Sequence, residues 1–136
     1  MAVPVTELQD GDKDTIAEYG QLGAMKIWQL LLSKKFGMYE IDRNTAVRET
    51  VSCIVLEAAE ALAPFLNATK PWKEQTVDFA EVDEEVVDIL HFVLAYFNLR
   101  GFNSKDVLER YRAKNLHNLT RVKKVQNVTE ATENSM

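Results

Sequence analysis

The sequence predicts an all-α protein with a four-helix bundle-like fold, and three observations carry that prediction. Apolar residues recur at three- and four-residue steps along most of the 136 residues. Alternating runs typical of strands never exceed a few residues. Glycine, proline and helix-capping residues divide the chain into four helical stretches. With 46% hydrophobic residues the chain can build one core, so we expect a single domain over residues 1–124 and a disordered polar tail over residues 125–136.

The first two helices are predicted from apolar spacing and from their ends. A first helix covers about residues 14–35, and Gly37 follows it as a left-handed cap. A second helix begins with Asn44 as its N-cap and continues to near Pro64. Because proline lacks the N–H that continues the helical ladder, Pro64 should stop or kink this helix.

The second half of the chain is predicted as a loop and two more helices. Residues 67–76 contain Pro71 and read as a loop. A third helix starts near Asp78, with Glu81 three residues on as in a capping box, and ends at Gly101. A fourth helix covers residues 104 to about 124.

Charge is distributed unevenly along the chain. The formal net charge is −5, yet residues 105–124 hold seven Lys or Arg against two Asp or Glu. Residues 1–104 hold nine basic and seventeen acidic side chains. This pattern does not fit a nucleic-acid-binding protein, which needs a broad basic face. It fits a pocket in which cations that hold phosphates balance acidic metal ligands.

Composition also predicts the compartment of the protein and whether it contacts a membrane. One cysteine, Cys53, excludes an internal disulfide framework. We find no signal peptide and no apolar run of membrane-spanning length, so we expect a cytoplasmic protein with no membrane partner.

Two acidic pairs are the most informative motifs. Glu57 and Glu60 lie one helical turn apart, as do Glu85 and Asp88, and each pair borders an apolar stripe. If the two helices pack through those stripes, the four carboxylates converge and need a compensating charge. Oxygen-only ligands favour Mg²⁺, or Mn²⁺, over Zn²⁺. The alternative is two solvated acidic faces, although neither pair has a basic partner at i,i+4 on its own helix.

Together these residues carry a resemblance to a known family. The ExxE and ExxD pairs, with 24 residues between Glu60 and Glu85, resemble the signature of the all-α nucleoside triphosphate pyrophosphatase superfamily, which includes MazG-like enzymes. The C-terminal third resembles the dimeric dUTPase and phage dCTP pyrophosphatase branch. The matching positions there are Glu85, Val86, Val87, Asp88, Ile89, Leu90, His91, Phe92, Gly101, Tyr111, Lys114, Asn115, Asn118 and Arg121.

The resemblance implies a reaction and a ligand set. Members of the family cleave a dNTP between its α- and β-phosphates, giving dNMP and pyrophosphate, with Mg²⁺ and a water nucleophile. By resemblance Glu57, Glu60, Glu85 and Asp88 are the metal ligands, and Glu57 also orients the water. Such chemistry needs cations on phosphate oxygens and a carboxylate that positions the water.

The fourth predicted helix offers groups for the nucleotide. Tyr111, Lys114 and Arg121 share one helix side, which can face the acids and hold the triphosphate. Asn115 and Asn118 can hydrogen-bond to sugar or base edges, and the alternative for them is ordinary surface polarity.

Four residues outside that helix are candidates for recognising the base or a phosphate. Trp72 corresponds to a base-contacting tryptophan of dimeric dUTPases, and the alternative is a core aromatic. Lys73 is a phosphate candidate. His91, one turn after Asp88, contacts the base or sugar or is a hydrogen-bonded core histidine. By a loose correspondence Gln29 reads the base.

Three functions therefore compete. The first is hydrolysis of dUTP or dCTP. The second is the same reaction on a purine or modified nucleotide such as dGTP or dATP. The third is a helical metal-binding interaction protein without catalysis. In each case we expect a homodimer or homotetramer, because four helices from 136 residues leave one face of the bundle thinly covered.

Overall fold

The computed structural model describes residues 3–70, 72 and 76–134, with side chains described as far as residue 122. The described residues form four helices and no strand: α1 (Asp10–Lys35), α2 (Arg43–Ala68), α3 (Phe79–Leu99) and α4 (Ser104–Asn134). The predicted all-α fold is confirmed. The chain divides into two units, Met1–Gly101 with α1 to α3, and Phe102–Met136 with α4. A single domain over residues 1–124 stays a prediction.

Helix α1 begins four residues earlier than predicted and contains a break. Gly20 has φ 76° and ψ 172°, so the helix consists of two segments joined at this glycine. The C-terminal end is as predicted. Gly37 has φ 75°, and the N–H groups of Gly37 and Met38 donate to the carbonyls of Lys34 and Ser33. These two hydrogen bonds together form a Schellman cap, which favours glycine, a residue without a Cβ, at the left-handed position.

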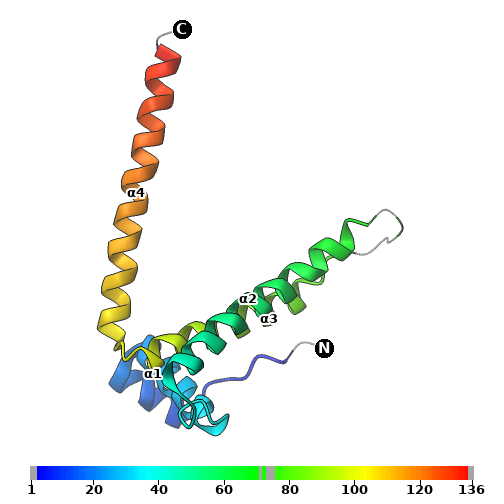
Figure 1. The fold of residues 1–136 in the computed structure, drawn as a ribbon, viewed down its shortest axis with the longest axis vertical. Coiled ribbons are helices and arrows are strands. Elements are labelled where there is room, and N and C mark those ends of the chain that lie inside the picture. The colour runs from blue at the N-terminus through cyan, green and yellow to red at the C-terminus, as the bar shows by residue number, and fades with distance from the viewer. Residues whose placement is uncertain (1–2, 71, 73–75, 135–136) are drawn as a thin grey trace. The chain divides into compact units, whose positions relative to one another are not determined.

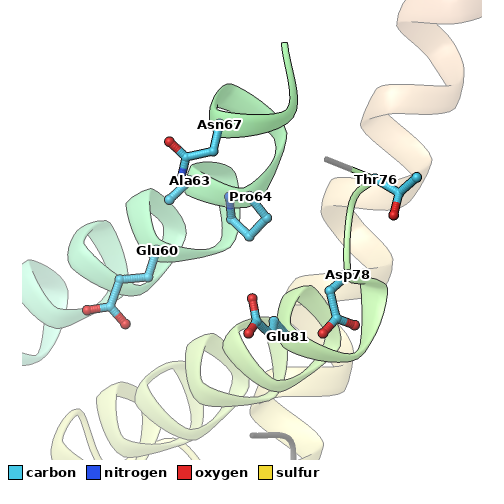
Figure 2. Close-up of a pocket in the computed structure, with 7 residues that line it drawn as sticks. All are labelled: Glu60, Ala63, Pro64, Asn67, Thr76, Asp78 and Glu81. Atoms are coloured by element: carbon cyan, nitrogen blue, oxygen red, sulfur yellow. The ribbon is translucent and has the colours of Figure 1, made fainter. Parts of the chain in front are cut away.

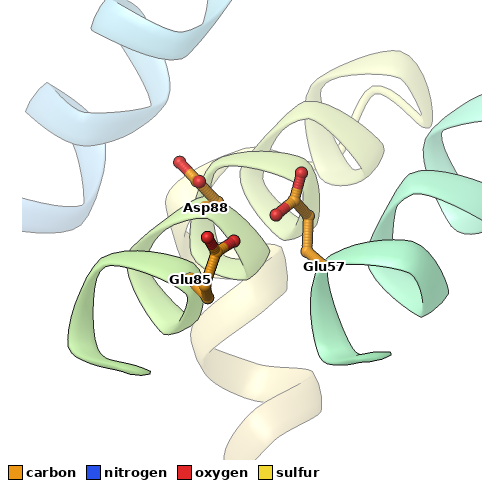
Figure 3. A group of neighbouring side chains, drawn as sticks. All are labelled: Glu57, Glu85 and Asp88. Atoms are coloured by element: carbon orange, nitrogen blue, oxygen red, sulfur yellow. The ribbon is translucent and has the colours of Figure 1, made fainter. Parts of the chain in front are cut away.

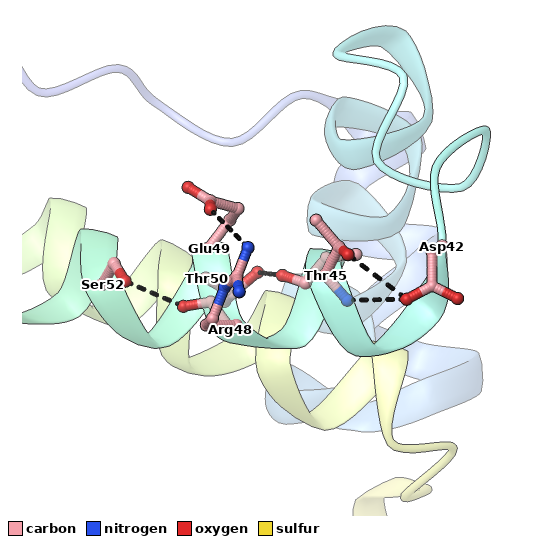
Figure 4. Close-up of polar contacts among 7 residues, drawn as sticks. Asp42, Thr45, Arg48, Glu49, Thr50 and Ser52 are labelled. Atoms are coloured by element: carbon pink, nitrogen blue, oxygen red, sulfur yellow. Dashed lines mark hydrogen bonds and ion pairs between the residues drawn. The ribbon is translucent and has the colours of Figure 1, made fainter.

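Helix α2 begins and ends differently from the prediction. The N-cap is Asp42, not Asn44, because the Asp42 carboxylate accepts from the Thr45 N–H at 3.1 Å and from the Thr45 hydroxyl at 3.2 Å (Figure 4). Pro64 does not end the helix, which continues to Ala68. Pro64 has no N–H to donate to the Glu60 carbonyl, so one helical hydrogen bond is lost. The other backbone hydrogen bonds of α2 continue on both sides of the proline.

Helices α2 and α3 run side by side, joined by the loop that contains Trp72 (Figure 1). The Phe65 and Phe79 rings meet edge to face, 6.0 Å apart, near the loop end of this pair. At the other end an Arg43 guanidinium nitrogen donates to the Leu99 carbonyl. Helix α1 packs on α3, where the Asn98 amide donates to the Lys26 carbonyl at 2.9 Å. These contacts fix the register in which α2 and α3 face each other.

Helix α3 begins and ends as predicted. The Asp78 carboxylate caps it by accepting from the Ala80 N–H at 3.0 Å, and Gly101, with φ 73°, follows its last turn. Helix α4 begins after a reciprocal cap between Asn103 and Asp106. It extends to Asn134, so the predicted helix end near residue 124 is wrong. The disordered tail over residues 125–136 stays a prediction.

Few apolar side chains are fully buried among the described residues. The buried hydrophobic residues are Ala24, Ala46, Leu94, Ala95 and Leu99. Within the described part, α2 alone is long and apolar enough to cross a membrane by length and composition, and the mean hydropathy of its most apolar stretch is 1.4. The expectation that no segment has this character is therefore wrong. A helix that is this apolar and this exposed usually packs its apolar side chains against another surface.

The cap of α2 gives a first testable prediction. Asp42→Ala should lower the free energy of unfolding by about 1 kcal/mol, because the Thr45 N–H loses its acceptor. Asp42→Asn keeps a side-chain oxygen at the cap and should retain most of that stability. Urea unfolding followed by circular dichroism measures both variants, and equal stability of the two would contradict the role given to Asp42.

Candidate functional site

Three carboxylates meet where α2 packs against α3. Glu57 lies on the side of α2 that faces α3, in line with the buried Ala46 and Thr50. Glu85 and Asp88 lie one turn apart on α3. Figure 3 shows the three side chains pointing toward one another from the two helices. The convergence expected from the apolar stripes is therefore present for these three residues.

The geometry of this acidic cluster, Glu57, Glu85 and Asp88, is compatible with one cation. One carboxylate oxygen from each residue lies within 4.8 Å of the others, and all three side chains are half-buried. Within the described residues, the buried Oε2 atoms of Glu57 and Glu85 have no hydrogen-bond partner. The ion pairs Arg48–Glu49 and Lys105–Glu109 lie elsewhere. Buried oxygens without partners are costly, so this donor set favours a bound hard cation.

Electrostatics in the cluster act most strongly on Glu85. When Glu85 carries a proton it can donate a hydrogen bond to the Glu57 carboxylate, and this is the largest cause that raises the pKa of Glu85 from the usual 4.5 to about 7. Desolvation by burial and the nearby Glu60 carboxylate act in the same direction. Carboxylates this close avoid ionising together, and one retains a proton near neutral pH when no cation is bound.

Glu60 occupies a different position from the other three predicted ligands. Its side chain is exposed and interacts with Glu85, but it lies outside the cluster of three. It lines a cavity of about 630 Å³ at the loop end of α2 and α3 (Figure 2). The other lining residues are Ala63, Pro64, Asn67, Thr76, Asp78 and Glu81.

The lining of this cavity includes residues that the sequence did not single out. Asp78 and Glu81, which the sequence predicted only as capping residues of the third helix, join Glu60 there. The signal that could have found Glu81 is its place one turn before Glu85 on the same helix. With three carboxylates around it, the cavity favours an anionic ligand only when cations accompany that ligand.

The base-recognition candidates in the first unit lie in different surroundings. Gln29 is buried in α1, where its amide nitrogen donates to the Ser33 hydroxyl at 3.0 Å and its buried oxygen has no partner among the described residues. Trp72 is 76% exposed. His91 is exposed on α3, with Nδ1 2.9 Å from the Val87 carbonyl oxygen. Lys73 lies outside the described residues.

The nucleotide candidates on α4 form a set within the second unit. Tyr111, Lys114, Asn118 and Arg121 are exposed. Asn115 is half-buried, and its side-chain oxygen accepts from Arg112 at 2.7 Å, so part of its hydrogen-bonding capacity is used on the helix surface. The roles of these residues toward a nucleotide stay predictions.

The raised pKa of Glu85 gives a second testable prediction. The folded protein holds this proton more tightly than the unfolded chain, so the stability it contributes is present below pH 4.5 and is lost as the pH rises to about 7. In EDTA, the melting temperature of the wild type should therefore fall across this interval more than that of Glu85→Gln. Asp83→Asn, which removes an exposed carboxylate from the same helix, is the control. Parallel pH profiles for the wild type and Glu85→Gln would contradict the coupling.

Comparison with known proteins places this architecture in a family. A family model described as dUTPase matches residues 25–100, which include Gln29, Trp72, His91 and both acidic pairs. Comparisons with curated proteins and with solved structures found no match. The matched segment is more than half of the chain, and the resemblance to the all-α nucleoside triphosphate pyrophosphatases is confirmed. The protein belongs to the dUTPase family.

Proposed function

We propose that this protein hydrolyses a pyrimidine deoxynucleoside triphosphate, dUTP or dCTP, to dNMP and pyrophosphate with Mg²⁺ or Mn²⁺. The observation that carries the proposal is the approach of the Glu57, Glu85 and Asp88 carboxylates within 4.8 Å, inside the segment that the dUTPase family model matches. A reaction on phosphoric anhydrides needs such a set of oxygen donors, because the polyphosphate brings several negative charges into the site.

Glu57, Glu85 and Asp88 would hold the metal, and Glu60 would join them from the edge of the neighbouring cavity. The unpaired buried oxygens of Glu57 and Glu85 support this assignment, since a divalent cation satisfies both. When bound, the metal would neutralise negative charge on the phosphate oxygens.

Glu57 would also orient the attacking water. Its carboxylate lies where α2 packs on α3, and one of its two oxygens can bind the metal while the other accepts a proton. The water oxygen bonds to the α-phosphorus, the bond from that phosphorus to the oxygen bridging the β-phosphorus breaks, and pyrophosphate leaves. Glu57 accepts the proton that the water releases.

The basic residues of α4 would contact the phosphates. Lys114 and Arg121 supply positive charge, and Tyr111 supplies a hydroxyl donor. Asn115 and Asn118 would hydrogen-bond to the sugar or base. Two observations support these roles. The residues share one side of α4, and the side chains of Tyr111, Lys114, Asn118 and Arg121 are exposed.

Base recognition would combine stacking with hydrogen bonding. The exposed Trp72 ring can stack on a base without choosing among bases. Discrimination would come from Gln29, whose buried oxygen lacks a partner, and from His91, while Lys73 would contact a phosphate. If a buried polar group of the protein hydrogen-bonds to one base but not to another, the protein prefers the first base by about 1–3 kcal/mol.

We also propose that the working unit is a homodimer or homotetramer. The described part of the chain buries three alanines and two leucines as its hydrophobic core and leaves many large apolar side chains exposed. Five buried hydrophobic residues form a small core for a chain of this length. Packing between copies would bury more apolar side chains and so stabilise the fold.

The reaction is tested by product analysis with all dNTPs and NTPs. With Mg²⁺ we expect pyrophosphate and dNMP, with dUTP or dCTP turned over fastest and no product in EDTA. Release of orthophosphate and dNDP would contradict the proposed bond cleavage, and faster turnover of dGTP or dATP would contradict the pyrimidine preference. No turnover of any nucleotide with Mg²⁺ or Mn²⁺ would leave a non-catalytic metal-binding protein as the better description.

The ligand set is tested separately by substitution. Asp88→Asn and Glu60→Gln should each reduce kcat by about 100-fold or more, since even groups that only orient metal ligands contribute about 10–100-fold. Saturating Mg²⁺ should raise the melting temperature of the wild type more than that of either variant. Asp83→Asn, an exposed carboxylate on α3 outside the cluster, should behave as wild type. Equal metal-induced shifts in all four proteins would refute the ligand assignment.

A further inference from the structure

The first residues that the structure describes in the unit Met1–Gly101 form an extended segment that contacts α3. Residues 3–9 precede α1 and run from its start along the α2 and α3 pair (Figure 1). Pro4 accounts for part of this conformation, because proline has no N–H to donate and restricts the preceding residue to extended geometry. The branched side chains of Val3 and Val5 also disfavour a helix. We call residues 3–9 the N-terminal strap.

The N-terminal strap is joined to α3 by a hydrogen bond beside an unfilled space. The Val3 N–H donates to Oε1 of Glu84 at 3.2 Å, across 81 positions of the sequence. Val3 and Val5 also line a cavity of about 360 Å³, and α3 forms its other side through Ala80, Asp83, Glu84 and Val87. Because the cavity interrupts close packing of the strap on α3, the hydrogen bond of Val3 is an important part of this contact.

The strap contacts the same side of α3 as helix α1 does. Helix α1 packs on the C-terminal part of α3, where the Asn98 amide donates to the Lys26 carbonyl. On a wheel of 3.6 residues per turn, Ala80, Glu84 and Val87 lie within roughly 60° of one another, and Asn98 falls in the same sector. Within the unit Met1–Gly101 the strap therefore extends the cover that α1 gives to α3 toward the N-terminus of α3.

The strap meets α3 at the turn that presents two members of the acidic cluster. Glu84 immediately precedes Glu85, and Val87 immediately precedes Asp88. Figure 3 shows the side chains of Glu85 and Asp88 pointing toward that of Glu57 on α2. The two residues that precede them line the cavity under the strap. This turn of α3 therefore lies between α2 on one side and the strap on another.

Gly20 provides a hinge between the strap and the second segment of α1. Its φ of 76° and ψ of 172° belong to a region that residues with a Cβ rarely enter. A Cβ at this position would meet nothing within 4 Å, so the backbone conformation, and not lack of space, favours glycine. Residues 10–19 connect the hinge to the strap, and the Gln9 N–H joins the two parts by donating to the Asp12 carboxylate at 3.0 Å. We call residues 3–19 the N-terminal arm.

We propose that the N-terminal arm opens and closes about Gly20, and that the closed arm, through the hydrogen bond from Val3 to Glu84, holds in place the turn of α3 that presents Glu85 and Asp88. Closure of the arm and binding of a divalent cation favour the same ordered turn, so each strengthens the other. The link to the cation rests on the metal site of the proposed function. The opening of the arm does not depend on it.

The first measurement is the distance between the arm and the α2 and α3 pair. Nitroxide labels at Glu7→Cys and Ser52→Cys, two exposed positions, report it by double electron–electron resonance in a Cys53→Ser background. Val3→Pro removes the N–H donor, and Glu84→Ala removes the acceptor. Each should raise the ratio of open to closed arm by roughly two- to tenfold, as expected for the loss of one hydrogen bond.

Matched variants separate the hydrogen bond from other effects of substitution. Val3→Ala keeps the N–H and Glu84→Gln keeps a side-chain oxygen, so both should retain most of the closed arm. The double variant Val3→Pro with Glu84→Ala should open the arm no further than either single variant, because both remove the same bond. Gly20→Ala should also favour the open arm, since alanine disfavours a φ of 76°.

Two measurements on unlabelled protein test whether closure holds the turn of α3. Hydrogen exchange of the backbone amides of residues 80–88, followed by mass spectrometry, should accelerate in Val3→Pro and Glu84→Ala. The dissociation constant of Mn²⁺ alone, measured by electron paramagnetic resonance of the free ion, should rise by roughly two- to tenfold in the same variants. Asp83→Ala removes an exposed carboxylate that lines the same cavity and should change neither quantity.

The outcomes separate the arm from the proposed function. Unchanged distances in Val3→Pro and Glu84→Ala would overturn the hinged arm. An arm that opens while exchange of residues 80–88 stays at the wild-type rate would overturn the holding of the turn. Faster exchange with an unchanged Mn²⁺ dissociation constant would overturn the link to the cation. A wild type that binds no Mn²⁺ would count against the metal site, and the distances and exchange rates would still decide on the arm.

Discussion

The repulsion among carboxylates between α2 and α3 is the interaction on which the rest of the site depends. Two helices that present apolar stripes pack readily, but here the same contact brings Glu57, Glu85 and Asp88 together. The unfavourable charge is tolerated because the apolar contacts of the pair and the links at its ends hold the helices in register. The raised pKa of Glu85 is the measurable sign of that conflict, which a divalent cation would relieve.

Much of this could be predicted from the sequence because helical periodicity fixes which residues share a side of a helix. The spacing of Glu57, Glu85 and Asp88 relative to the apolar stripes was sufficient to predict that their side chains converge. The caps at Gly37 and Gly101 were predictable for a similar reason, since the left-handed conformation each adopts is costly for other residues.

The errors fall where local signals compete. Asp42 and Asn44 are both good N-cap residues, and only the backbone geometry of the turn decides which carboxylate or amide reaches the free N–H groups. Pro64 lies in a helix whose packing on α3 outweighs one lost hydrogen bond. The side chain of Glu60 was grouped with the other acids by spacing, but its position on the wheel turns it toward the cavity beside them.

Helix α2 also has a consequence for how this protein can change in evolution. One side of the helix packs on α3 and carries Glu57, the opposite half is uncharged between Val51 and Leu66 and mostly apolar, and between them Glu49, Glu60 and Asn67 form a narrow polar strip. A polar substitution on one side would enter the helix pair, and a charge on the other would interrupt the apolar half. The number of neutral substitutions available to α2 is therefore small, whereas α4 has exposed polar positions on several sides.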